Sequence, residues 1–72
     1  MKWYEYWSVK SKERVWWTQR DSAGNCFEIR CSGAEKLRLF MNETFKGRFS
    51  TLIEAQNAAQ HLADNQTKED PR

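Results

Sequence analysis

The chain has 72 residues, a formal net charge of +2 and ten aromatic residues, four of them Trp. A chain of this length forms one domain with one small core, because it buries only about 60% of its unfolded surface. No apolar run approaches the ~18 residues of a membrane span, and the N-terminus lacks the uncharged stretch of a signal peptide. We therefore expect a soluble cytoplasmic protein without a membrane partner, in which Cys26 and Cys31 are thiols.

The charge is unevenly distributed along the chain. Residues 1–48 carry ten Lys or Arg against six Asp or Glu, whereas residues 49–72 carry two against four. The positive excess of the first part hints at an anionic partner. An ordinary solvated surface explains the same imbalance, so the charge alone does not assign a function.

The first 41 residues show the alternation of polar and apolar side chains that is typical of β-strands. The pattern predicts strands at residues 2–9, 14–20, 26–31 and 36–41. Short polar loops separate these segments, and short loops favour antiparallel pairing of neighbouring strands. Residues 42–46 either extend the fourth strand or begin a fifth.

A helix is predicted to begin at Leu52. Thr51 is the expected N-cap, and Glu54 is placed to reach back to the Thr51 amide in a capping box. Apolar residues then recur at helical spacing, at Leu52, Ala55, Ala58, Ala59 and Leu62. A stripe made mostly of alanine lets a helix approach a flat surface closely, so we expect this helix to pack on the sheet.

These elements predict an α+β fold, an antiparallel meander of four or five strands with one C-terminal helix packed on one face. Residues 1–64 should form the domain. Residues 65–72 contain no large apolar side chain and are expected to be a disordered polar tail.

Alternation assigns each strand residue to a face of the sheet. The face covered by the helix is expected to hold Val15, Trp17, Phe27, Ile29, Leu37 and Leu39, with Trp7 and Phe49 at its margins. The open face is expected to hold Tyr4, Tyr6, Arg14, Trp16, Arg20, Arg30, Arg38 and Phe40, interrupted by Glu28. Aromatic and guanidinium groups can stack on bases and contact phosphate. The same groups anchor protein interfaces and homodimers, or simply stabilise a thin sheet, and the sequence leaves these three alternatives open.

Catalysis finds little support in the sequence. The one histidine, His61, falls on the helix side opposite the alanine stripe, and no nucleophile is placed beside it. Two cysteines five residues apart and one distant histidine do not supply a zinc site. The three glycines are scattered, so no phosphate-binding loop is present. We expect a binding protein rather than an enzyme, with no catalytic residue, no metal, no cofactor and no small-molecule substrate.

The segment GRFSTLIEAQNAA, at residues 47–59, contains Gly47, Phe49, Thr51 and Ala55 in a G-x-F-x-T-x-x-x-A pattern. It resembles the end of the sheet-plus-helix domains of plant ethylene-response factors and phage-integrase arm-binding modules. It also looks like the end of many small prophage proteins of unassigned function. The first resemblance implies a sheet that lies in the DNA major groove, with contacts made by Arg14, Trp16, Arg20 and Arg30. The second implies, as the alternative, a phage-type accessory or inhibitor protein that acts through protein contacts. The additional N-terminal strand departs from the three-stranded plan of the first family.

Overall fold

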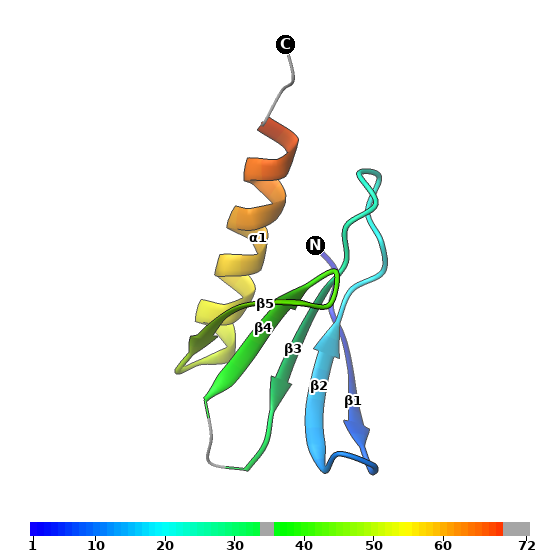
Figure 1. Ribbon diagram of the computed structural model, residues 1–72, viewed down its shortest axis with the longest axis vertical. Coiled ribbons are helices and arrows are strands. Elements are labelled where there is room, and N and C mark those ends of the chain that lie inside the picture. Colours follow the sequence, from blue (N-terminus) through cyan, green and yellow to red (C-terminus); the bar gives the residue numbers. More distant parts are fainter. Residues whose placement is uncertain (34–35, 69–72) are drawn as a thin grey trace.

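The structure, a computed structural model, describes residues 1–33 and 36–68. It consists of an antiparallel sheet and one C-terminal helix (Figure 1). The strands are β1 (Tyr4–Ser8), β2 (Glu13–Trp17), β3 (Phe27–Cys31), β4 (Leu37–Met41) and β5 (Thr44–Phe49), and the helix is α1 (Leu52–Lys68). Each strand pairs with its neighbours in chain order, so the sheet is a five-stranded meander. The expected α+β architecture is confirmed.

The ambiguous segment 42–46 forms a tight turn and the beginning of β5. Asn42 and Glu43 both have positive φ, at 52° and 71°. Two consecutive residues in this conformation give a hairpin turn whose twist matches that of the strands on either side. The turn therefore sends the chain straight back along β4, and the fifth strand is present.

The N-terminal cap of α1 forms largely as the sequence predicts. The Thr51 hydroxyl accepts a hydrogen bond from the Glu54 amide at 3.2 Å, which identifies Thr51 as the N-cap. The Glu54 carboxylate also reaches back, but it accepts from the amide of Ser50, at 3.3 Å, rather than from that of Thr51. The cap fixes the first turn of the helix directly after the last strand.

The helix is longer than expected. It ends at Lys68, so residues 65–68 of the predicted tail are helical. On the outer surface of α1 the Gln60 amide donates to the Asp64 carboxylate at 3.1 Å. Such contacts four residues apart support a helix without any burial. The rest of the predicted tail, residues 69–72, lies outside the described residues, as do residues 34–35 of the predicted turn between β3 and β4.

The core lies between α1 and strands β3, β4 and β5. It consists of the buried side chains of Phe27, Ile29, Leu37, Leu39, Ala55 and Ala59. Ala55 and Ala59 are fully buried, as the alanine stripe predicts. Their small side chains bring the helix backbone close to the large side chains of the sheet, each of which contributes about 1.5–3 kcal/mol when buried. Among the described residues, α1 makes its contacts with these three strands and not with β1 or β2, and Figure 1 shows β1 and β2 extending to one side of it.

The predicted faces of β2 are wrong by one residue. Trp16 pairs directly with Ile29 and packs against the core, so the even-numbered residues of β2 lie on the helix side of the sheet. Val15 pairs with Arg30 and therefore lies, with Trp17, on the opposite side.

The loop after β2 fixes this register. Thr18 is buried, and its hydroxyl accepts a hydrogen bond from the Phe27 amide at 3.0 Å. The Thr18 amide in turn donates to the Phe27 carbonyl at 3.0 Å. The two residues thus continue the β2–β3 ladder by one rung, and this rung places Thr18 on the same side as the core residue Phe27.

Because α1 stops short of β1 and β2, the helix side of this hairpin is only partly covered. Trp3 and Trp16 pack against the edge of the core. Trp7 is 55% exposed, and Arg14 forms an exposed ion pair with Glu5 at 3.1 Å. No helical layer enforces which side of β2 is apolar, so hydrophobicity in the sequence did not reveal it.

Candidate functional site

The side of the sheet that faces away from α1 is here called the helix-free face. It carries aromatic and charged side chains of all five strands that take no part in the core under the helix. Register and alternation assign twelve residues to it. They are Tyr4, Tyr6, Ser8, Glu13, Val15, Trp17, Glu28, Arg30, Arg38, Phe40, Phe45 and Arg48. The residues that matter for function fall into two rows, each of which crosses all five strands.

The first row, here called the aromatic row, places a carboxylate between two aromatic pairs. Its members, in order across the sheet, are Tyr4, Trp17, Glu28, Phe40 and Phe45. The rings of Tyr4 and Trp17 are stacked, with centroids 4.8 Å apart. The rings of Phe40 and Phe45 meet edge to face at 5.7 Å. Each inner ring is therefore supported from outside by an outer one, and both arrangements are favourable.

The second row, here called the arginine row, crosses the sheet beside the first. Its members are Tyr6, Val15, Arg30, Arg38 and Arg48. Three arginines in directly opposed positions repel one another. Glu13 relieves two of them: its carboxylate accepts a hydrogen bond from Arg30 at 3.2 Å and another from Arg38.

Glu13 is the buried acid of this face. Burial acts to raise the pKa of Glu13, but the hydrogen bonds and charges of Arg38 and Arg30 outweigh it and hold that pKa below its usual value. Burial alone would lower the pKa of Arg30, but the neighbouring carboxylates of Glu28 and Glu13 raise it above its usual value. The Arg30 guanidinium also contacts Glu28, at 2.7 Å. Arg30 and Arg38 are thus held in ion pairs on the protein itself.

Val15 shows how closely these side chains cover the sheet. It is fully buried, although no helix lies on its side. Its direct neighbours across the strands are Tyr6 and Arg30. Long side chains that lie along the sheet can bury apolar atoms while their charged or polar ends stay wet. The middle of the helix-free face is therefore a packed layer rather than a bare sheet.

Two adjoining hollows open on the helix-free face. The larger, of about 350 Å³, is here called the aromatic hollow, and its lining includes Tyr6, Trp17 and Phe40. The smaller, of about 290 Å³, is lined partly by Arg30 and Arg38. Both are lined by Glu28, Phe40 and Glu43, and the two adjoining hollows together are here called the groove.

The hairpin turn between β4 and β5 supplies one lip of this groove. Asn42 fastens the turn to the start of β3, because its side-chain oxygen accepts from the Cys26 amide at 3.0 Å. Its side-chain nitrogen donates to the Asn25 side chain at 2.9 Å. The turn holds Glu43 at the groove in a left-handed conformation that favours glycine or asparagine. Glu43 thus occupies a backbone conformation that glutamate rarely adopts.

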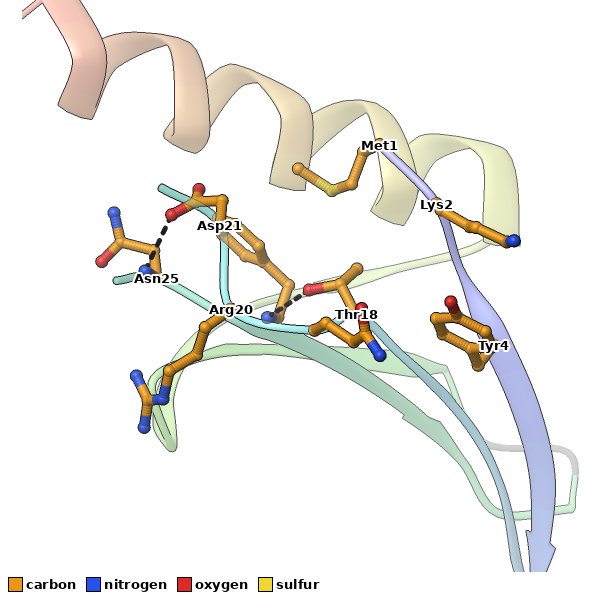
Figure 2. Close-up of a pocket in the computed structure, with 9 residues that line it drawn as sticks. Met1, Lys2, Tyr4, Thr18, Arg20, Asp21 and Asn25 are labelled. Carbon is orange, nitrogen blue, oxygen red and sulfur yellow. Dashed lines mark hydrogen bonds between the residues drawn. The ribbon is translucent and has the colours of Figure 1, made fainter. Parts of the chain in front are cut away.

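A third hollow, of about 230 Å³, lies at the end of the sheet near the N-terminus (Figure 2). Figure 2 shows the side chain of Arg20 pointing away from Met1, Lys2 and Tyr4. The Arg20 guanidinium donates to the carbonyl of Gly24 at 2.7 Å. Arg20 therefore closes its own loop and is not part of the helix-free face.

The predicted open-face residues are thus only partly brought together. Five of the eight share the helix-free face: Tyr4, Tyr6, Arg30, Arg38 and Phe40. Arg14 and Trp16 lie on the helix side, and Arg20 lies in a loop, so their predicted placement is wrong. The four residues implied by the DNA-binding resemblance, which include Arg30, consequently do not share one surface. A binding role for these eight residues stays a prediction.

Sequence reasoning missed several residues of this face. Trp17 is predicted on the covered face because the predicted faces of β2 are exchanged. Glu13 flanks a short turn and Phe45 lies in the segment of ambiguous structure, whereas Arg48 lies in the segment 47–59, and no spacing signal marks any of the three. The sequence predicts Glu28 as an interruption of the open face, and the strand register places it at the centre of the aromatic row.

Among residues 1–33 and 36–68, no group of three or more His, Cys, Asp or Glu side chains is placed to hold a metal ion. In the same residues, no helix is both long and apolar enough to cross a membrane. No family model matches the chain, and neither a curated protein nor a solved structure was found to be similar to it.

Proposed function

We propose that this chain is a small protein-binding module that contacts a partner protein through the groove of its helix-free face. The observation that carries the proposal is the aromatic row. Aromatic side chains are enriched at the anchoring positions of protein interfaces, because they bury a large area with few rotatable bonds. Here the rings of Trp17 and Phe40 are held in place by Tyr4 and Phe45. A surface that is already ordered loses little entropy when a partner docks.

Nucleic-acid binding through the same face is the competing prediction. The arginine row and the aromatic rings favour it, because guanidinium groups contact phosphate and rings stack on bases. Two observations weigh against it. Arg30 and Arg38 are already engaged by Glu13, and Glu28, which pairs directly with Trp17, carries a charge that repels phosphate. Glu43 adds a further acidic group at the groove. The charges of the face therefore nearly cancel.

A photo-crosslinking experiment tests the proposal. Tyr6 is 47% exposed in the lining of the groove, and Ile53 is 68% exposed on the helix. Each is replaced in turn by photoreactive benzoylphenylalanine, and the protein is irradiated in lysate of the source cells. We expect a discrete protein adduct from position 6 and none from position 53.

Equal adducts from both positions would contradict the proposal, because they would indicate collision rather than docking. An adduct from position 6 that nuclease treatment removes would support nucleic-acid binding instead. In that case titration with random-sequence DNA must also show affinity that falls steeply as salt rises.

A further inference from the structure

The aromatic hollow has an unusual combination of lining groups. The aromatic residues Tyr6, Trp17 and Phe40 come from β1, β2 and β4, and Glu28 and Glu43 also line the hollow. None of the described residues that line it is basic. Aromatic rings have a negative electrostatic potential on their faces. The Glu43 carboxylate adds a full negative charge, whereas Arg30, at 2.7 Å, partly neutralises that of Glu28. The hollow therefore disfavours an anion and favours a cation.

The register sets the width of the aromatic hollow. Glu28 pairs directly with Trp17 on one side and with Phe40 on the other. Neighbouring strands are about 4.8 Å apart, so the Cα atoms of Trp17 and Phe40 are about 10 Å apart. An unbranched alkyl chain that makes contacts at about 4 Å on each side fits between two such side chains. Its terminal charge would then lie over the Glu28 carboxylate.

The outer rings of the aromatic row already hold cations of the chain itself. The Lys2 ammonium lies 5.5 Å from the centre of the Tyr4 ring, and the Arg48 guanidinium lies 5.4 Å from that of Phe45. Among the described residues, no cation lies over the two inner rings, which belong to Trp17 and Phe40. The faces of the inner rings have the same negative potential as those of the outer rings, but no cation of the described residues lies over them.

We propose that the aromatic hollow binds the alkylammonium group of a lysine side chain on the partner protein. This inference rests on the proposed function and specifies the chemistry of the partner. Ring faces and carboxylates together recognise ammonium groups in proteins. The Glu28 carboxylate contacts Arg30 through Oε2 at 2.7 Å, which leaves Oε1 for a second contact. The Glu43 carboxylate has no ion pair within the described residues and sits at the lip of the hollow.

Butylammonium chloride is a direct probe of this site. We expect the indole N–H resonance of Trp17 to shift and saturate when butylammonium is added to the purified protein, as measured by nuclear magnetic resonance. Sodium butyrate at the same ionic strength, and butanol, should produce no comparable shift. The glutamine variants Glu28→Gln and Glu43→Gln should each weaken the affinity about two- to fivefold, as expected for a partly exposed cation site.

The variant Glu5→Gln is the matched control, because it removes one negative charge from the helix side of the sheet. Its affinity for butylammonium should equal that of the wild type. The lysine-binding inference is overturned if no saturation occurs below about 100 mM, if butanol shifts Trp17 equally, or if the two glutamine variants bind as the wild type does.

The outcomes also separate this inference from the proposed function. A protein adduct at position 6 that forms equally well with Glu28→Gln and Glu43→Gln would leave the protein-binding function intact and overturn the lysine site. Loss of that adduct in both variants, with Glu5→Gln unaffected, supports the lysine site. Absence of any discrete adduct from the wild-type chain contradicts the proposed function itself.

Discussion

Replacing Glu13 by glutamine tests whether one carboxylate holds the arginine row together. Glutamine has nearly the same shape, but it cannot neutralise Arg30 and Arg38, which lie directly opposite each other. Removing one partner of a fully buried ion pair costs about 3–5 kcal/mol. The two arginine side chains are 34% and 27% exposed, so water screens part of this loss. We expect Glu13→Gln to lower the free energy of unfolding by about 1–3 kcal/mol.

The effect of this substitution should depend on pH in a defined direction. Burial acts to raise the pKa of Glu13, but Arg38 and Arg30 hold it below the ordinary glutamate value of 4.5 in the folded protein. A carboxylate with a depressed pKa in the folded state contributes its stability above the unfolded-state pKa. That contribution is lost as the pH falls through the folded-state pKa. The stability difference between wild type and Glu13→Gln should therefore be complete near neutral pH and shrink in acid below about pH 4.

Thermal unfolding followed by circular dichroism measures this difference. For a domain of this size, the expected destabilisation lowers the melting temperature on the order of 10 °C at about pH 7. Glu5→Gln is the control, because its ion pair with Arg14 is exposed and should contribute little. This role of Glu13 is refuted if Glu13→Gln and the wild type have the same melting temperature at neutral pH, or if the difference between their melting temperatures does not shrink in acid.

Two further predictions concern the helix and its cap. Ala59→Asp places an unpaired charge in the core, which a domain of marginal stability cannot accommodate, so cooperative melting by circular dichroism should be lost. Asn57→Asp, on the exposed side of the same helix, is the control and should melt like the wild type. A sharp wild-type transition for Ala59→Asp would show that α1 is not packed on the sheet. Thr51→Ala removes the N-cap acceptor and should lower the free energy of unfolding, measured in urea, by about 1 kcal/mol. Thr51→Ser keeps a hydroxyl at this position and should retain most of the wild-type stability. Equal stability of the two variants would mean that the cap contributes nothing.

The sequence was sufficient to predict the layers of this fold. Alternation in the first 41 residues defines four strands, and the capped alanine stripe defines a helix that can approach a sheet closely. Both signals are local, and on β3 and β4 they concern the part of the sheet that the helix covers. For this reason the predicted core residues Phe27, Ile29, Leu37 and Leu39 are confirmed.

The site could be predicted only in part, because it depends on which way β2 faces. Trp16 and Trp17 are adjacent, so either orientation places one indole on each side of the sheet, and both are half-buried in the structure. The helix does not reach β2, and the orientation is instead set by the Thr18–Phe27 rung, a contact between residues nine apart. The pairing of Glu13 with Arg38 spans 25 residues. Contacts of this range follow from strand register, which the local pattern does not specify.

Under the proposed function, the helix-free face, rather than the helix side of β1 and β2, docks the partner protein. The most direct measurement compares the yield of the crosslink from position 6 in two variants of the crosslinker-bearing protein, Trp17→Ala and Trp16→Ala. Both are irradiated at a temperature at which circular dichroism shows them to be folded. We expect Trp17→Ala to abolish the adduct, because it removes a wall of the groove. We expect Trp16→Ala to lower stability but to retain the adduct. Loss of the adduct in Trp16→Ala with full retention in Trp17→Ala would contradict docking through the helix-free face.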